Sequence, residues 1–164
     1  LDVLSKTDSL TGAINRRAFD DLLLKHYENR HEEKCFVMML DIDNFKTIND
    51  NFGHQAGDDY LKAFVSSLKT AVRESDLVSR LGGEEFCVIL SNLNQDKVLQ
   101  IAERMCSLIQ ALSISSNCKK ITTTVSIGIS EIDIGDQSKK EVLARADAAL
   151  YEAKREGKNR YKLF

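Results

Sequence analysis

Four stretches of the chain carry side chains that recur with the period of an α-helix. The positions on these faces are Phe19, Leu22, Leu23, His26 and Tyr27 in the first stretch, Leu61, Phe64, Val65, Leu68, Ala71 and Val72 in the second, Val98, Ile101, Ala102, Met105, Ile109 and Leu112 in the third, and Val142, Leu143, Ala146, Ala149, Leu150 and Ala153 in the fourth. Each pattern predicts an amphipathic helix. Gly157 is expected to end the last helix, because glycine is favoured just past a helix C-terminus.

Short apolar runs between these helices predict five strands, at residues 35–40, 77–81, 86–91, 121–130 and 160–163. The run 36–40 is apolar on both faces, which indicates a central strand covered by helices. After the first helix the elements follow the order βαββαβ, with a hairpin in the middle. This order predicts an α+β fold with a ferredoxin-like sheet rather than a doubly wound one. We expect residues 1–8 to end a linker from an upstream region and residues 9–164 to form one domain.

Composition limits the partners of such a domain. Its 164 residues suffice for one core, and a net charge of −2 gives no overall attraction to nucleic acid or to an anionic membrane. The four cysteines show no metal or redox spacing, which favours reduced thiols, and no apolar run could span a bilayer. A first residue other than Met indicates a fragment. We therefore expect a cytoplasmic domain, whether or not its parent protein is membrane-anchored.

The candidate chemistry begins at Gly82-Gly83-Glu84-Glu85, which joins two of the predicted strands. Adjacent glycines favour a tight turn and leave room for a ligand beside the main chain. Adjacent carboxylates are costly unless a cation or a proton donor compensates them. The stretch is therefore either a solvated acidic turn or part of a site for a metal-bound nucleotide.

Another carboxylate, Asp41, ends the predicted central strand. In a βαββαβ sheet the hairpin with Glu84 should lie on the neighbouring strand, so both carboxylates are expected at one rim. Such a pair, without His or Cys nearby in sequence, suits a hard cation such as Mg²⁺, which takes its other ligands from water and phosphates. Alternatively, Asp41 is only a turn residue at the strand end. Asp43 could be a second ligand or a turn stabiliser.

Five motifs, in order along the chain, carry a resemblance to a known family. They are residues 8–17, residues 41–50 with Gly53-His54 and Gly57-Asp58, residues 82–86, residues 124–128, and residues 146–154 with 157–159. Together they resemble the GGDEF family, the diguanylate cyclases, in its form with Glu at the third position. The resemblance covers nearly the whole chain. It implies the palm fold of nucleotidyl cyclases and polymerases, and the condensation of two GTP molecules into cyclic di-GMP and two pyrophosphates.

The resemblance also implies a metal centre. Asp41, Glu84 and the main-chain carbonyl of Ile42 are the implied ligands of Mg²⁺, or of Mn²⁺ in its place. Glu85 becomes a candidate for taking the proton from the ribose 3′-hydroxyl, a role that metal-bound hydroxide or water could also fill.

The substrate site is implied in the same way. Main-chain N–H groups in a loop at Asn44, Phe45 and Lys46 would face the terminal phosphates, Lys154 and Lys158 would bind phosphate, and Asn49 and Asp58 would read guanine. The family usually has Arg where this chain has Lys158, and lysine lacks the planar fork of arginine. Without the resemblance, the lysines would simply complement a helix dipole, and Asp58 would be an ordinary acid at a helix start.

Regulation and assembly follow from the same resemblance. Arg73, Asp76 and Arg104 correspond to an inhibitory site for the product; alternatively, Arg73 ends a helix and Asp76 stabilises a turn. Because each 3′-hydroxyl attacks the other nucleotide, and one domain supplies one half-site, we expect a homodimer. An upstream sensor or dimerising domain would control it.

Two other functions compete with that of a diguanylate cyclase. One is a catalytically silent module that binds GTP or cyclic di-GMP, which the intact acidic and base-reading residues argue against. The other is a polymerase or a mononucleotide cyclase with the same palm. A polymerase would need a basic groove for nucleic acid, and the chain has no extended Lys/Arg stripe.

Overall fold

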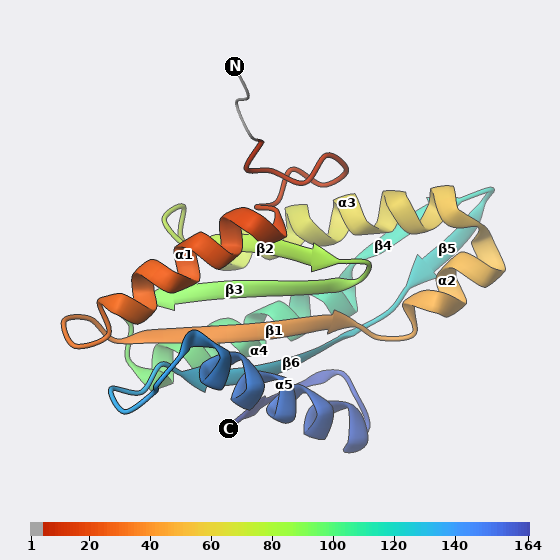
Figure 1. Cartoon of the computed structure of the whole chain (residues 1–164). Helices are drawn as coiled ribbons and strands as arrows, with labels where there is room; N and C mark the ends of the chain where they lie inside the picture. The colour runs from red at the N-terminus through yellow and green to blue at the C-terminus, as the bar shows by residue number, and fades with distance from the viewer. Residues whose placement is uncertain (1–4) are drawn as a thin grey trace.

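The computed structural model describes residues 5–164, which form a five-stranded sheet, a two-stranded hairpin and five helices (Figure 1). The elements are α1 (Arg16–Glu28), β1 (Cys35–Ile42), α2 (Phe45–Phe52), α3 (His54–Ala71), β2 (Leu77–Gly82), β3 (Glu85–Ser91), α4 (Gln95–Ala111), β4 (Ser113–Ser116), β5 (Lys119–Thr122), β6 (Val125–Glu131), α5 (Lys139–Arg155) and β7 (Arg160–Leu163). None of the helices in this part of the chain is both long and apolar enough to cross a membrane.

The main sheet has the strand order β2-β3-β1-β6-β7. Strand β1 lies in the middle and pairs antiparallel with both β3 and β6, whereas β7 joins the edge parallel to β6. The predicted α+β, palm-like fold is confirmed, including the apolar central strand. Because β1 is central, its end lies beside the β2–β3 hairpin, the start of β6 and the turn after α5.

The two faces of β1 are buried under different helices. Phe36, Met38 and Leu40 belong to a core shared with α3 and α4, whereas Val37 packs in a second core with Phe19 of α1. Figure 1 shows the corresponding layers, with α1 and α5 on the near face of the sheet and α4 behind it. Each such side chain contributes about 1.5–3 kcal/mol by burial, so the position of β1 is strongly fixed.

Two segments differ from the predicted elements. Residues 121–130 are two strands rather than one: β5 pairs with β4 in a separate hairpin, and β6 begins at Val125 in the main sheet. The hairpin turns at Asn117 and Cys118, which both have positive φ. The segment after β1 is the short helix α2 instead of a loop, because Phe45 and Ile48 reach the core from one of its faces.

The first four residues of the predicted linker, residues 1–4, lie outside the described residues. The next residues contact the start of α1: the side chains of Asn15 and Arg17 both donate to the carbonyl oxygen of Ser5, at 2.9 Å. The boundary between linker and domain stays a prediction.

We expect Gly128→Ala to destabilise the fold, because α5 packs directly on the backbone of β6 at this glycine. A Cβ there would lie 2.1 Å from the carbonyl oxygen of Ala146 and 2.2 Å from the amide nitrogen of Leu150. Overpacking of this kind costs about 1–3 kcal/mol or more. Urea denaturation measures the loss. Gly135→Ala is the control, since the nearest atom there is a side-chain oxygen at 3.1 Å; equal stability of the two variants would contradict the prediction.

Candidate functional site

The end of β1 faces the hairpin between β2 and β3. Asp41 is the register partner of Glu85, and the amide of Ile42 donates to the carbonyl oxygen of Glu84 at 3.3 Å. Asp41 is 7% exposed, Glu84 is half-buried and Glu85 is exposed. The fold therefore brings the predicted acidic residues to the same rim of the sheet.

The negative charge of Asp41 is balanced by a lysine of helix α5. The ammonium of Lys154, near the end of α5, forms an ion pair with the Asp41 carboxylate. Burial raises the pKa of Asp41 and outweighs the lowering by Lys154, while the negative charges of Glu84 and Glu85 raise it further. A carboxylate in this environment favours a cation beside it.

The donor set at this rim consists of oxygens. Within residues 5–164 no group of three or more His, Cys, Asp or Glu side chains could hold a metal ion. The rim offers the carboxylates of Asp41 and its neighbour Glu84. Such a pair fits Mg²⁺, which binds through one or two carboxylates and completes its octahedron with water and phosphates. The Lys154 ammonium on Asp41 shows that this place accepts a positive charge.

The glycines of the hairpin provide the turn and open space. Gly83 has φ +50° and lies in the left-handed region, and a bulge interrupts the pairing between Arg80 and Gly82. Apart from the adjoining residues of the chain, no atom of residues 5–164 lies within 4 Å of a Cβ built on either Gly82 or Gly83. A ligand can thus approach the main chain here, as the glycine pair predicted.

Hydrogen bonds of Arg80 connect the hairpin to the N-terminal segment, a link that no sequence pattern predicts. The guanidinium of Arg80 donates to the carbonyl oxygen of Gly83 at 3.0 Å and to the Asp8 carboxylate at 3.2 Å. The same carboxylate accepts from the amide and the hydroxyl of Thr11, at 2.9 and 2.7 Å. Asp8 lies in the first of the five motifs, but nothing in its local pattern points to Arg80, 72 positions away.

The two predicted base-reading residues lie on adjacent helices. A Cβ on Gly57 would come within 1.9 Å of the Asn49 amide oxygen, so the side chain of Asn49 rests on the backbone of α3 at Gly57. Asp58 follows directly and is half-buried. This close approach requires glycine, and it fixes Asn49 of α2 against the turn of α3 that carries Asp58.

Two of the predicted phosphate-binding residues, Lys158 and Asn44, meet at the start of α2. Lys158 donates to the side-chain oxygen of Asn44 at 2.8 Å, which connects the turn after α5 to the end of β1. Asn44 has φ +57°, and its side chain makes no capping bond to α2. The N–H groups of a helix's first turn have no partners within the helix, and they favour an anion. The side chain of Phe45 is buried in the core, so only its main chain faces the site, whereas Lys46 is exposed.

The sequence left two alternatives for Asp43, a second metal ligand or a residue that stabilises a turn. It is buried, and its carboxylate accepts hydrogen bonds from the hydroxyls of Thr124 and Ser126, at 2.6 and 2.7 Å. These hydrogen bonds tie the end of β1 to the start of β6, which agrees with the alternative of a turn stabiliser.

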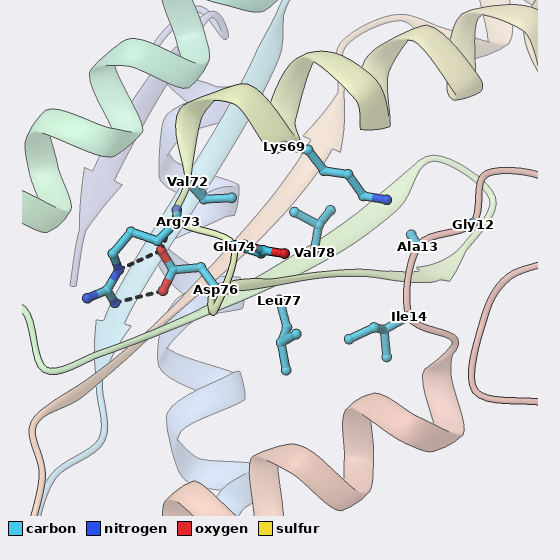
Figure 2. A pocket seen from close by; sticks show the side chains of 10 residues that line it. All are labelled: Gly12, Ala13, Ile14, Lys69, Val72, Arg73, Glu74, Asp76, Leu77 and Val78. Carbon is cyan, nitrogen blue, oxygen red and sulfur yellow. Dashed lines mark hydrogen bonds and ion pairs between the residues drawn. The ribbon is translucent and has the colours of Figure 1, made fainter.

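The three residues of the predicted inhibitory site lie around the end of α3. Arg73 and Asp76 form a two-pronged ion pair, with N–O distances of 2.7 and 3.0 Å (Figure 2). Asp76 also accepts the main-chain N–H of Arg73, so it stabilises the turn as well. Arg104 donates to the carbonyl oxygen of Ala71 at 3.1 Å and lines a hollow of about 230 Å³ together with Arg73. The other side of Arg73 borders a larger hollow, which Lys69 and Glu74 also line.

Comparison with known proteins places these motifs in a family context. A family model described as "Diguanylate cyclase, GGDEF domain" matches residues 5–160. Diguanylate cyclase A of Treponema denticola is 38% identical over 98% of this chain and 44% of its own length. Probable diguanylate cyclase DgcC of Escherichia coli is 35% identical over 98% of this chain and 43% of its own length. The chain thus spans less than half the length of these relatives.

Solved structures show the same fold. The GGDEF domain of DgcB from Caulobacter crescentus, crystallised in complex with c-di-GMP, superposes with a TM-score of 0.92 at 33% identity, over 99% of this chain and 98% of that chain. Diguanylate cyclase SiaD of Pseudomonas aeruginosa, in complex with its activator SiaC, gives a TM-score of 0.93 at 34% identity, over 98% of this chain and 62% of that one.

We expect Asp8→Asn to lower stability by about 1 kcal/mol near pH 7, because a charged hydrogen-bond acceptor is lost. Partial burial raises the pKa of Asp8, but hydrogen bonds from Thr11 and the Arg80 guanidinium together bring it below its ordinary value of 3.8. A lowered native pKa means that the stabilisation is present above pH 3.8 and is lost as the pH falls through the native value.

Urea denaturation of the native protein and the Asp8→Asn variant at matched pH values measures this difference. It should shrink at acidic pH, and a difference that stays constant would contradict the assignment. The exposed Asp147 supplies the control substitution, Asp147→Asn.

Proposed function

This chain belongs to the GGDEF family of diguanylate cyclase domains, and on that premise we propose that it condenses two molecules of GTP into cyclic di-GMP and two pyrophosphates. The observation that carries the proposal is the convergence of Asp41, the Glu84 hairpin and Lys154 at one rim of the sheet. Acidic metal ligands and a phosphate-binding cation are needed together for nucleotidyl transfer.

In the proposed reaction, the 3′-oxygen of one GTP attacks the α-phosphorus of the other, and pyrophosphate leaves. Asp41 and Glu84, with the main-chain carbonyl of Ile42, would hold Mg²⁺ or Mn²⁺. A divalent ion held there would supply Lewis-acid stabilisation of the charge that develops at the α-phosphate. With the Asp41 carboxylate bound to such an ion, Lys154 would be free of its ion pair and would bind the phosphates instead.

The remaining residues orient the substrate. Lys158 and the main-chain N–H groups at the start of α2 bind the terminal phosphates. Asn49 and Asp58 recognise guanine, since a carboxylate accepts from the N1–H and exocyclic amine that adenine does not present together. Glu85, exposed at the rim opposite Asp41, takes the proton of the attacking hydroxyl.

A complete reaction centre requires two copies of the chain. Each copy binds one GTP, and both ring-closing bonds form only when two sites face each other, so we propose an antiparallel homodimer. A region of the parent protein upstream of this domain would control the encounter. The relatives are more than twice as long as this chain, which leaves room for such a region in them.

We further propose feedback inhibition by the product at Arg73, Asp76 and Arg104. Arginine suits this role because it binds phosphate through two parallel hydrogen bonds and stacks on bases. The complex of the Caulobacter DgcB domain with c-di-GMP supports product binding by a domain of this fold.

The test of catalysis is incubation with GTP and Mg²⁺ at high protein concentration, with products identified by mass spectrometry. We expect cyclic di-GMP, and a loss of at least about 100-fold in rate for Asp41→Asn, because a charged group at the reacting phosphate is removed. Asp59→Asn, at an exposed position of α3, is the control.

Other products would decide between the alternatives. Cyclic GMP would identify a mononucleotide cyclase. Persistent absence of a cyclic product, even from a fusion to a dimerising coiled coil, would favour a silent module that binds GTP or cyclic di-GMP.

For the inhibitory site, we expect Arg104→Ala to raise the concentration of cyclic di-GMP needed for half-inhibition at least about tenfold, since a charged contact to phosphate is lost. The measurement is the initial rate at increasing product concentration. Arg16→Ala, an exposed arginine at the start of α1, is the control. Unchanged inhibition of the Arg104 variant would place the product elsewhere.

A further inference from the structure

The carboxylate of Asp43 lies inside the protein at the end of β1 and is 2% exposed. Three donors from two other segments converge on it. The hydroxyl of Ser126 donates to Oδ1 at 2.7 Å, and the hydroxyl of Thr124 and the main-chain amide of Asn159 donate to Oδ2 at 2.6 and 3.1 Å. Both oxygens of this buried acid are thus bound by the protein itself.

The main chain of Asp43 takes part in the same arrangement. Its amide donates to the carbonyl oxygen of Thr124 at 2.9 Å, and its carbonyl oxygen accepts from the hydroxyl of Thr123. Within residues 5–164, Asp43 forms no ion pair with a lysine, arginine or histidine. A buried carboxyl group without an ion pair is tolerated only where hydrogen bonds satisfy it, so the geometry of these donors is tightly constrained.

The segments joined at Asp43 are those that carry the proposed site. Asp41 precedes it by two residues and Asn44 follows it directly. On the other side, Asn159 belongs to the turn after α5, in which Gly157, Lys158 and Asn159 all have positive φ. Such a turn is unfavourable for non-glycine residues unless other contacts hold it, and the bond from Asn159 to Asp43 is one of those contacts.

Lys158 depends on this turn for its position. Its ammonium reaches the side chain of Asn44 at 2.8 Å only while the turn after α5 stays against the end of β1. Both connections, Asn159 to Asp43 and Lys158 to Asn44, join the same two segments. Loosening the first is therefore expected to release the second.

We propose that Asp43 is a positioning residue for nucleotide binding. Its hydrogen bonds hold the turn after α5 and the β5–β6 link against the end of β1. In this position Lys158 and the proposed metal ligand Asp41 can bind the same triphosphate. The proposal rests on the proposed function for the identity of the nucleotide. Asp43 itself touches neither substrate nor metal.

The test compares two substitutions at this end of the sheet with two matched ones at the other end. Asp43→Asn keeps the size of the side chain and replaces one accepting oxygen by a donor, and Ser126→Ala removes a single hydrogen bond. Ser130→Ala removes an equally buried hydroxyl of β6, which donates to Val142 at 2.7 Å.

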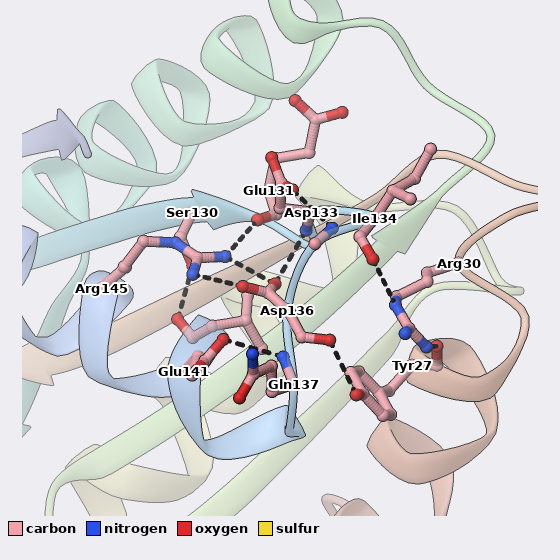
Figure 3. A network of polar contacts seen from close by, with 12 residues as sticks. Tyr27, Arg30, Ser130, Glu131, Asp133, Ile134, Asp136, Gln137, Glu141 and Arg145 are labelled. Carbon is pink, nitrogen blue, oxygen red and sulfur yellow. Dashed lines mark hydrogen bonds and ion pairs between the residues drawn. The ribbon is translucent and has the colours of Figure 1, made fainter.

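Asp136→Asn is the fourth variant. Asp136 is also buried, but it accepts from Arg145 and from the amide of Asp133 in the loop between β6 and α5 (Figure 3). Asp136 stabilises the loop before α5, which follows the end of β6 that pairs with the start of β1, whereas Asp41 lies near the other end of β1.

Two quantities are measured for each variant: hydrogen exchange of the segment 157–160 without ligand, and the affinity for the α,β-methylene analogue of GTP with Mg²⁺. For Asp43→Asn and Ser126→Ala we expect exchange at least about tenfold faster in that segment and a loss of affinity of about tenfold or more. The controls Ser130→Ala and Asp136→Asn should lower stability to urea about as much as Ser126→Ala and Asp43→Asn do. They should change the affinity for the analogue by less than about twofold.

A purely structural role would predict the opposite pattern. If Ser126→Ala and Asp43→Asn lose stability but keep native exchange at 157–160 and native affinity, the proposal is wrong. Should Asp43→Asn fail to fold, Ser126→Ala alone decides. Hydrogen exchange also separates this proposal from the proposed function: a protein that binds no GTP would refute the function, while faster exchange at 157–160 would still support the positioning role.

Discussion

An acid at the end of a buried central strand has to be compensated, and the surroundings of Asp41 are arranged around that requirement. Burial raises its pKa, and the neighbouring Glu84 and Glu85 add to the effect. The positive charge that balances Asp41 belongs to Lys154, in the last turn of α5. Helix α5 reaches this position because Gly128 lets it lie directly on the backbone of β6. The packing of one helix is therefore part of the electrostatics of the rim.

The rim is held by contacts between segments distant in sequence. Asp8 and Arg80 fix the carbonyl oxygen of Gly83 in the hairpin, and Asp43 fixes the turn that carries Lys158. Both devices use a carboxylate that accepts several hydrogen bonds at once. The proposed attack of a ribose 3′-hydroxyl on an α-phosphate needs groups held within a fraction of an ångström. The anchoring of both the hairpin and the turn suits that need.

The sequence predicted most of the fold and the meeting of Asp41 with the Glu84 hairpin at one rim of the sheet. The features that it did not predict have physical reasons. The central strand was predictable because residues 36–40 are apolar on both faces, and the hairpin because two glycines separate two apolar runs. Helix α2 was missed because eight residues are too short a window for a periodic pattern to stand out, although its apolar positions Phe45, Ile48 and Phe52 have helical spacing. The roles of Asp43 and of the Asp8–Arg80 link were not predictable, because hydrogen bonds across 72 or more positions leave no local pattern.

The ion pair between Lys154 and Asp41 has a consequence for the resting protein. In small metal-binding domains whose ligands repel one another, the apo chain unfolds, and folding waits for the ion. Here an internal counter-ion occupies the acid, and the apolar cores on both faces of β1 are complete without any ligand. The described domain can thus fold without a bound ion, and a divalent ion bound at Asp41, as proposed above, would affect activity rather than the survival of the fold.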